Sequence, residues 1–175
     1  MTTAETNRTL GETLAGKYLS FFLAKEEYGI QILRVREIIG IVDITPLPRT
    51  PEFVKGVVNL RGKIIPVVDL RAKFGMAGAA YGAETCIVVV DLRSDVDGSV
   101  VQMGCVVDTV SEVLDVRAEQ VEEAPPCARA NSDFLLGLGK CKDKVLILLD
   151  IDRILTTLEL ATLHAGQRTA PQVGG

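Results

Sequence analysis

Short apolar runs separated by polar turns follow one another through most of the chain and predict antiparallel β-strands. Three pairs of such runs stand out, at residues 18–35, 56–70 and 86–110. They are rich in Val, Ile and Phe, and each pair surrounds a short polar segment, which is the pattern of a β-hairpin. In the third pair, Asp97-Gly98 supplies the positive φ that a tight turn requires. The predicted fold is therefore mostly β.

The chain also repeats itself. Residues 29–39 (GIQILRVREII) can be laid over residues 104–114 (GCVVDTVSEVL) without a gap, so that Gly, Val, Glu and the apolar positions between them match. A glycine is followed after thirteen positions by an aspartate that ends an apolar run, at residues 56–69 and again at residues 137–150. Two repeats of short strands favour two small barrels over one sandwich, because closure removes the exposed edges of short sheets.

This duplication sets the expected domain organisation. We expect one folded region over residues 17–163, made of two five-stranded barrels at about residues 17–80 and 81–163. The polar, aperiodic residues 1–16 and the small-residue end at residues 164–175 are expected to be flexible tails. The first hairpin can complete either barrel, and the sequence leaves this choice open.

Two short helices complete the prediction. Asp69 can cap a helix that begins at Leu70, and Asp150 can cap one over residues 151–160, whose apolar positions form a single stripe. The second helix is expected to seal one open end of the barrels. Capping accounts for both aspartates, so it is preferred to a role as catalytic acids.

Composition and charge narrow the class of protein. The chain has 175 residues, a net charge of -4 and a mean hydropathy of +0.27, which is high for a protein without a membrane span and suggests apolar surface covered by a partner. It lacks the cluster of Lys and Arg that a nucleic-acid partner requires. Apolar runs are far shorter than the roughly 20 residues that cross a bilayer, and widely spaced cysteines suit a reducing compartment. We expect a cytoplasmic protein.

Candidate chemistry is sparse. The single histidine, His164, has no nucleophile placed beside it in the pattern, and no phosphate-binding glycine loop occurs. Asp95-x-Asp97-Gly98 resembles the start of a calcium loop, but Val106 stands where a bidentate carboxylate is needed. We therefore expect no catalysis, metal or cofactor. The alternative is a small β-barrel ligand-binding protein or enzyme with a site between the barrels.

Several stretches resemble the CheW family of chemotaxis coupling proteins, most specifically NLRG followed by PVVDLR. The likeness runs from about Tyr18 to Leu163, and its clearest stretches are residues 26–40, 46–75, 118–126 and 134–155. The resemblance implies two packed SH3-like β-barrels. It also implies a non-catalytic adaptor, peripheral to membrane-bound receptor arrays, that joins the cytoplasmic tips of methyl-accepting chemoreceptors to the regulatory domain of the histidine kinase CheA.

The same resemblance implies a receptor-binding face. By position in the matching motifs, the residues that bind the receptor or support that face are Val35, Glu37, Gly56 and Arg61. Arg61 lies at a predicted hairpin tip, where a guanidinium suits carboxylates and carbonyls of another protein. Because Glu112 matches Glu37 in the repeat, a shared structural role for Glu37 stays open. The kinase-binding residues are not assigned.

Overall fold

The computed structural model describes residues 10–78, 80–93, 98–129 and 134–154. A short helix at residues 10–14 precedes the first strand. The other elements are, in chain order, β1 (Gly16–Leu23), β2 (Glu26–Gln31), η1 (Ile32–Arg34), β3 (Val35–Gly40), β4 (Val54–Leu60), β5 (Lys63–Asp69), α2 (Leu70–Lys73), β6 (Cys86–Arg93), β7 (Val100–Val107), β8 (Thr109–Val116), η2 (Ala118–Gln120), β9 (Val121–Glu122), α3 (Pro126–Arg129), β10 (Leu135–Cys141), β11 (Lys144–Leu149) and η3 (Ile151–Arg153).

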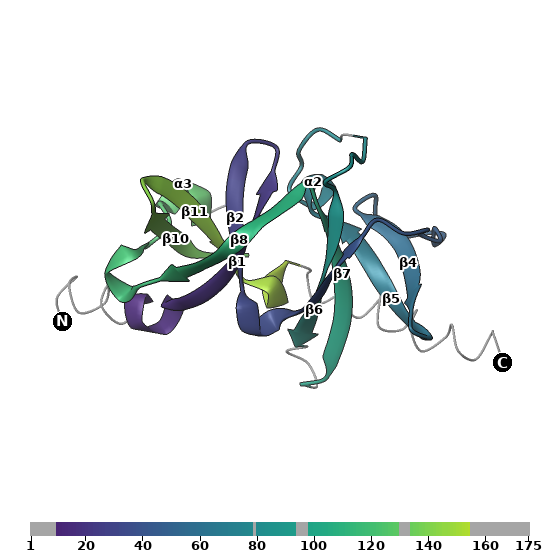
Figure 1. Ribbon diagram of the computed structural model, residues 1–175, viewed down its shortest axis with the longest axis horizontal. Coiled ribbons are helices and arrows are strands. Elements are labelled where there is room, and N and C mark those ends of the chain that lie inside the picture. The colour runs from purple at the N-terminus through teal and green to yellow at the C-terminus, as the bar shows by residue number, and fades with distance from the viewer. Residues whose placement is uncertain (1–9, 79, 94–97, 130–133, 155–175) are drawn as a thin grey trace. The chain divides into compact units, whose positions relative to one another are not determined.

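The strands form two sheets, in the orders β8-β1-β2-β11-β10-β9 and β3-β6-β7-β5-β4. Most of these strands are labelled in Figure 1. Apart from Thr109, the first residue of β8, each sheet lies in one compact unit. Among the described residues, unit 1 contains residues 10–34 and 110–154, and unit 2 contains residues 35–109. The prediction of a mostly β fold with two barrel units is confirmed.

The division between the units differs from the boundary expected near residue 80. The first hairpin, β1–β2, lies in unit 1, where β2 runs parallel to β11 with Tyr28 opposite Ile147. The hairpin β6–β7 lies in unit 2, where β7 runs parallel to β5 with Gly104 opposite Val67. Each unit is thus completed by a hairpin from the other half of the chain, and hydrophobic periodicity alone does not specify this exchange.

The two sequence repeats have the same backbone features: a register shift before the glycine and a hydrogen bond at the aspartate. A register shift precedes Gly56 in β4, and an equivalent shift precedes Gly137 in β10. At the end of β5, the Asp69 N–H donates to the Phe53 carbonyl over 2.8 Å, and the Asp150 N–H makes the matching 2.8 Å bond to Phe134 at the end of β11. The matched glycines and aspartates therefore occupy equivalent positions.

Both aspartates cap the turn that follows them, as predicted. The Asp69 carboxylate accepts a 3.0 Å hydrogen bond from the Arg71 N–H, and the Asp150 carboxylate accepts one of 3.1 Å from the Asp152 N–H. The turn after Asp150 is the 3-10 helix η3, and the rest of the helix predicted over residues 151–160 lies outside the described residues.

A helix at residues 10–14 lies within the segment 1–16 that was expected to be a flexible tail. Leu14 is buried, Leu10 packs against the same core, and the Tyr18 hydroxyl donates a 2.7 Å hydrogen bond to the Leu14 carbonyl. Leucines four residues apart on one helical face contribute apolar area to this core. Residues 1–9 and 164–175 of the predicted tails lie outside the described residues.

Each unit has its own apolar core. The core of unit 1 contains Leu14, Tyr18, Leu114, Val116, Cys141, Leu146 and Leu148. The core of unit 2 contains Val58, Ile65, Val67, Ile87, Val89 and Val106. Burial raises the pKa of the nearby Cys105 thiol to about 12, so this side chain remains protonated and behaves as the small apolar residue that its strand predicted. No helix among the described residues has the length and apolar character needed to cross a membrane.

Candidate functional site

Arg61 stands at the tip of the hairpin formed by β4 and β5, as the sequence predicted. Arg61 and Gly62 both adopt left-handed backbone conformations, with φ of 54° and 85°. This turn closes the hairpin tightly, because two positive φ angles match the twist of the flanking strands. The Asn59 side-chain oxygen accepts a 2.8 Å hydrogen bond from the Gly62 N–H and fixes the turn. The arginine side chain is thereby displayed from a rigid loop.

The Arg61 guanidinium donates two parallel hydrogen bonds to the carboxylate of Glu37 in β3. Nη1 donates to Oε1 and Nη2 to Oε2, both over 2.8 Å. The hydrogen bond to Glu37, followed by the charge of that carboxylate, raises the pKa of Arg61. The Arg61 side chain is 75% exposed and that of Glu37 is 25% exposed. The pair is therefore a preformed fork with its arginine facing outward.

Gly56 has a backbone role in this region. Its φ is +139°, and a Cβ at this position would lie 2.0 Å from the Thr45 carbonyl oxygen. Thr45 and Val57 exchange two backbone hydrogen bonds of 2.9 Å, which hold the chain close against β4. Only glycine tolerates both the conformation and the close approach. Gly56 thus supports the shape of the strand that leads to Arg61.

Val35 is the first residue of β3 and is half-buried opposite Val90 of β6. A register shift between Val35 and Glu37 bends this strand. Of the four residues predicted for the site, the structure joins Glu37 and Arg61 directly. Val35 and Gly56 lie on the strands that carry them.

Unit 1 contains the equivalent of this pair, which the sequence reasoning missed. Lys142 and Asp143 turn between β10 and β11 with φ of 50° and 62°, and the Lys142 Nζ donates a 2.9 Å hydrogen bond to Glu112 of β8. Lys142 follows Gly137 by five positions, as Arg61 follows Gly56. That spacing, together with the match of Glu112 to Glu37, is the signal that could have found it.

The two ion pairs also close their sheets. β3 is the first strand in the order of its sheet, and the turn that carries Arg61 follows β4, the last strand. In unit 1, Glu112 lies on β8 at one end of the order, whereas Lys142 follows β10 near the other end. Each pair therefore links strands that share no backbone hydrogen bonds, which gives Glu37 a structural role in addition to any binding role.

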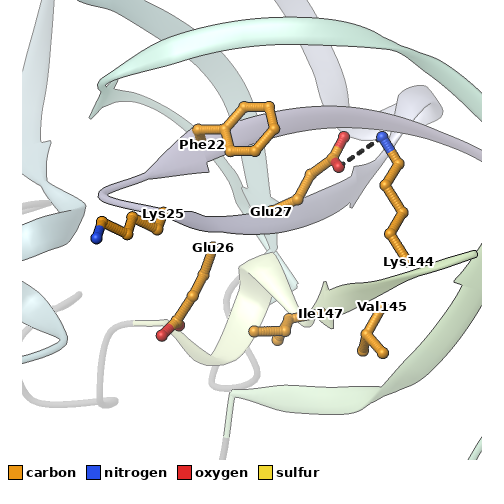
Figure 2. Close-up of a pocket in the computed structure, with 7 residues that line it drawn as sticks. All are labelled: Phe22, Lys25, Glu26, Glu27, Lys144, Val145 and Ile147. Carbon is orange, nitrogen blue, oxygen red and sulfur yellow. Dashed lines mark ion pairs between the residues drawn. The ribbon is translucent and has the colours of Figure 1, made fainter.

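A pocket of about 350 Å³ lies in unit 1 where β2 and β11 begin (Figure 2). Its lining residues are Phe22, Lys25, Glu26, Glu27, Lys144, Val145 and Ile147. Figure 2 shows Glu27 and Lys144 pointing toward one another, and their Oε1 and Nζ atoms are 2.7 Å apart. The Glu27 side chain is only 4% exposed, and the Lys144 ammonium is its ion-pair partner. Within the described residues, no group of three or more His, Cys, Asp or Glu is placed to hold a metal ion.

Two SH3-like β-barrels with a charged hairpin tip in each define the structural class, a double-barrel domain. The family model described as CheW-like domain matches residues 17–159, so the chain belongs to the CheW family. This confirms the resemblance noted in the NLRG and PVVDLR motifs.

Curated proteins and a solved structure agree with the family match. "Chemotaxis protein CheW" of Klebsiella aerogenes is 42% identical over 159 residues, covering 90% of this chain and 92% of that protein. "Chemotaxis protein CheW" of Thermotoga maritima is 32% identical over 149 residues, covering 85% and 93%. The crystal structure of "scaffolding protein TtCheW" from Thermoanaerobacter tengcongensis matches with a TM-score of 0.73 and 34% identity, covering 82% of this chain and 96% of that one.

Proposed function

We propose that this chain is a non-catalytic adaptor that couples methyl-accepting chemoreceptors to the histidine kinase CheA in chemotaxis. The observation that carries the proposal is the Glu37–Arg61 fork, displayed at a rigid hairpin tip in a chain of the CheW family. The names of the relatives, chemotaxis protein and scaffolding protein, support the same class of function. The comparisons do not favour a ligand-binding barrel or an enzyme. The place of action is the periphery of membrane-bound receptor arrays.

The receptor tip binds around Glu37 and Arg61. Arg61 has five N–H donors and uses Nη1 and Nη2 for Glu37, so further donors remain for carboxylates or backbone carbonyls of a partner. Glu37 holds the guanidinium in one orientation, which lowers the entropy lost when a partner binds. Gly56 preserves the strand geometry beneath the tip, and Val35 supports β3 from its half-buried position.

The kinase's regulatory domain binds elsewhere on the chain. Exposed apolar side chains in unit 2 support this proposal: Ile38 of β3 is 45% exposed, and Val42, just after this strand, is 46% exposed. A few such side chains at the centre of an interface supply most of its affinity. The adaptor transmits a signal only if the receptor's signalling states bind this chain differently, because a partner with equal affinity for both states shifts nothing.

Substitution Arg61→Glu tests the receptor face. It places two carboxylates together at the tip, so binding to a receptor cytoplasmic fragment should fall by roughly tenfold or more, as expected for a lost charge-assisted pair. Affinity should be measured by titration calorimetry, with kinase activation measured in the reconstituted complex of receptor fragment, adaptor and kinase. Binding to the isolated regulatory domain should not change.

Lys142→Glu is the matched control, because it makes the same change at the equivalent tip of unit 1. It should leave receptor affinity at the wild-type value. The charge-swapped pair Glu37→Arg with Arg61→Glu should keep the fold while weakening the receptor contact. Wild-type affinity and kinase activation in the Arg61→Glu variant would show that this face does not bind the receptor.

A further inference from the structure

Within the described residues, an ion pair stands at each of the two places where the chain passes from one unit to the other. Arg34 is the last residue of the first segment of unit 1, and it holds Asp152 through two charge-assisted hydrogen bonds, one of 2.9 Å from Nη1 to Oδ1. Asp108 precedes the last residue of unit 2 and accepts two hydrogen bonds from Arg71, one of 2.8 Å from Nε. All four side chains are at most 30% exposed.

Parallel strand pairing places these residues together. Gly104 of β7 lies opposite Val67 of β5, so Asp108 and Arg71, each four residues further on, meet beyond the ends of their strands. In unit 1 Gly29 of β2 lies opposite Leu148 of β11, so Arg34, five residues past Gly29, meets Asp152, which is four residues past Leu148. Each ion pair therefore depends on the hairpin pairing: Arg34 meets Asp152 when β2 pairs with β11, and Asp108 meets Arg71 when β7 pairs with β5.

The two ion pairs have opposite polarity. Asp152 and Arg71 occupy the same place in the repeat, because each follows the capping aspartate of its unit by two positions. In unit 1 the crossover residue is the cation, Arg34, whereas in unit 2 the crossover residue is the anion, Asp108. The residue two positions after the capping aspartate is thus paired with an opposite charge in both units, and the signs are reversed, although Arg34 and Asp108 stand one position apart in the repeat alignment.

We infer that this reversal selects the exchanged pairing of the hairpins over a contiguous one, in which each half of the chain folds on itself. In the contiguous arrangement β2 would dock on β5 and β7 on β11. Arg34 would then face Arg71, and Asp108 would face Asp152. Both contacts become repulsive, and the attraction present in the observed fold is lost.

Other features of the repeat do not distinguish the two arrangements. The hairpins β4–β5 and β10–β11 share the register shift, the backbone hydrogen bond at the strand end and the aspartate cap. The pairs Glu37–Arg61 and Glu112–Lys142 each join β3 or β8 to the hairpin that follows it in sequence, so they form in either arrangement. Charges at partly buried positions supply a specificity that similar apolar surfaces lack.

Inverting the charges of one ion pair tests whether these charges select the exchanged hairpin pairing or only stabilise the folded protein. Arg34→Asp with Asp152→Arg keeps opposite charges in both observed contacts, but it also makes both contiguous contacts attractive. The mirror variant, Arg71→Asp with Asp108→Arg, does the same through unit 2. All four substitutions together restore the reversed pattern, with repulsion in the contiguous arrangement.

Each chain is unfolded in guanidinium, refolded by dilution at low micromolar concentration and recovered as monomer. Nuclear Overhauser contacts then report whether β2 lies beside β11, through Tyr28 and Ile147, or beside β5. Wild type and the fourfold variant should refold with the β2–β11 contact. In both double variants, the ratio of contiguous to exchanged monomer should rise by roughly tenfold or more, since two repulsive contacts are removed.

If both double variants refold only with the β2–β11 contact, at the wild-type rate, the charges do not select the arrangement and the inference is wrong. It is equally wrong if the fourfold variant populates the contiguous form as much as the doubles do. The experiment uses no receptor or kinase, so its result is independent of the proposed function.

Discussion

In each unit a basic side chain at a hairpin tip pairs with a glutamate near the other end of the sheet, but the basic residue differs between the units. In unit 2, Arg61 binds Glu37 through two hydrogen bonds of 2.8 Å, whereas in unit 1 Lys142 binds Glu112 through one of 2.9 Å. Glu112 is also 4.0 Å from Lys144, which pairs with Glu27. A planar guanidinium fixes a direction, and an ammonium acts as a point charge that neighbours can share. The comparison separates the charge pair across the sheet ends, which both units have, from the fixed fork, which is found at the tip of unit 2 and which we propose the receptor binds.

The largest difference between the units should come from the matched glycines. Gly56→Ala places a Cβ 2.0 Å from the Thr45 carbonyl oxygen at a positive φ, whereas the nearest atom at Gly137 is the Glu122 carbonyl oxygen at 2.9 Å. We expect Gly56→Ala to lower the free energy of unfolding by roughly 3 kcal/mol or more, and Gly137→Ala by about 1 kcal/mol. Urea unfolding monitored by circular dichroism measures both values, and equal losses would contradict the distinction.

An intermediate effect should follow from the helix at residues 10–14, which packs on the core of unit 1. Leu14→Ala removes a buried side chain and should cost roughly 2–4 kcal/mol. Hydrogen exchange should show the loss of protection first in β1, with β4 of unit 2 affected less. Glu12→Ala, on the exposed face of the same helix, is the control and should cost little. Uniform loss of protection in both units would mean that they unfold as one.

The smallest effect concerns the charge pair of unit 1. The hydrogen bond from Lys142, followed by the charges of Lys142 and Lys144, lowers the pKa of Glu112 below its ordinary value. A lowered pKa in the folded state means that this carboxylate stabilises the fold above its unfolded pKa, and that the contribution is lost as pH falls through the folded pKa. Lys142→Met should raise the pKa of Glu112 in a carboxyl-detected NMR titration, and an unchanged midpoint would show that Lys142 does not govern it.

Much of the fold followed from local chemistry. Alternation and turn residues predicted the hairpins, the glycine-to-aspartate spacing predicted the duplication, and Asp69 and Asp150 cap their turns as expected. The contact of Glu37 with Arg61 could not be derived from local pattern, because the two residues are 24 positions apart and join opposite ends of a sheet. Family resemblance suggested both residues without indicating that they bind each other.

The hydrophobic pattern did not predict the helix at residues 10–14 or decide the exchange of hairpins, for different reasons. The helix at residues 10–14 is too short for its periodicity to stand out, and it is stabilised by packing rather than by propensity. The exchange of hairpins is a choice between similar docking surfaces, which hydrophobic periodicity describes equally well. We infer that the charges of Arg34 and Asp108 determine that choice. The sequence alone does not reveal this role, because it does not show that the two residues bind Asp152 and Arg71.

Because of the exchange, the first hairpin is synthesised long before the strand with which it pairs. Within the described residues, unit 2 is one continuous segment, residues 35–109, inserted between the two segments of unit 1. On the ribosome β1–β2 emerges first, yet its partner β11 begins only at Lys144. At translation rates of about 5–20 residues per second, that wait is on the order of ten seconds. For most of this time the newly made β4–β5 is already within reach, so synthesis from the N-terminus presents the wrong partner before the right one.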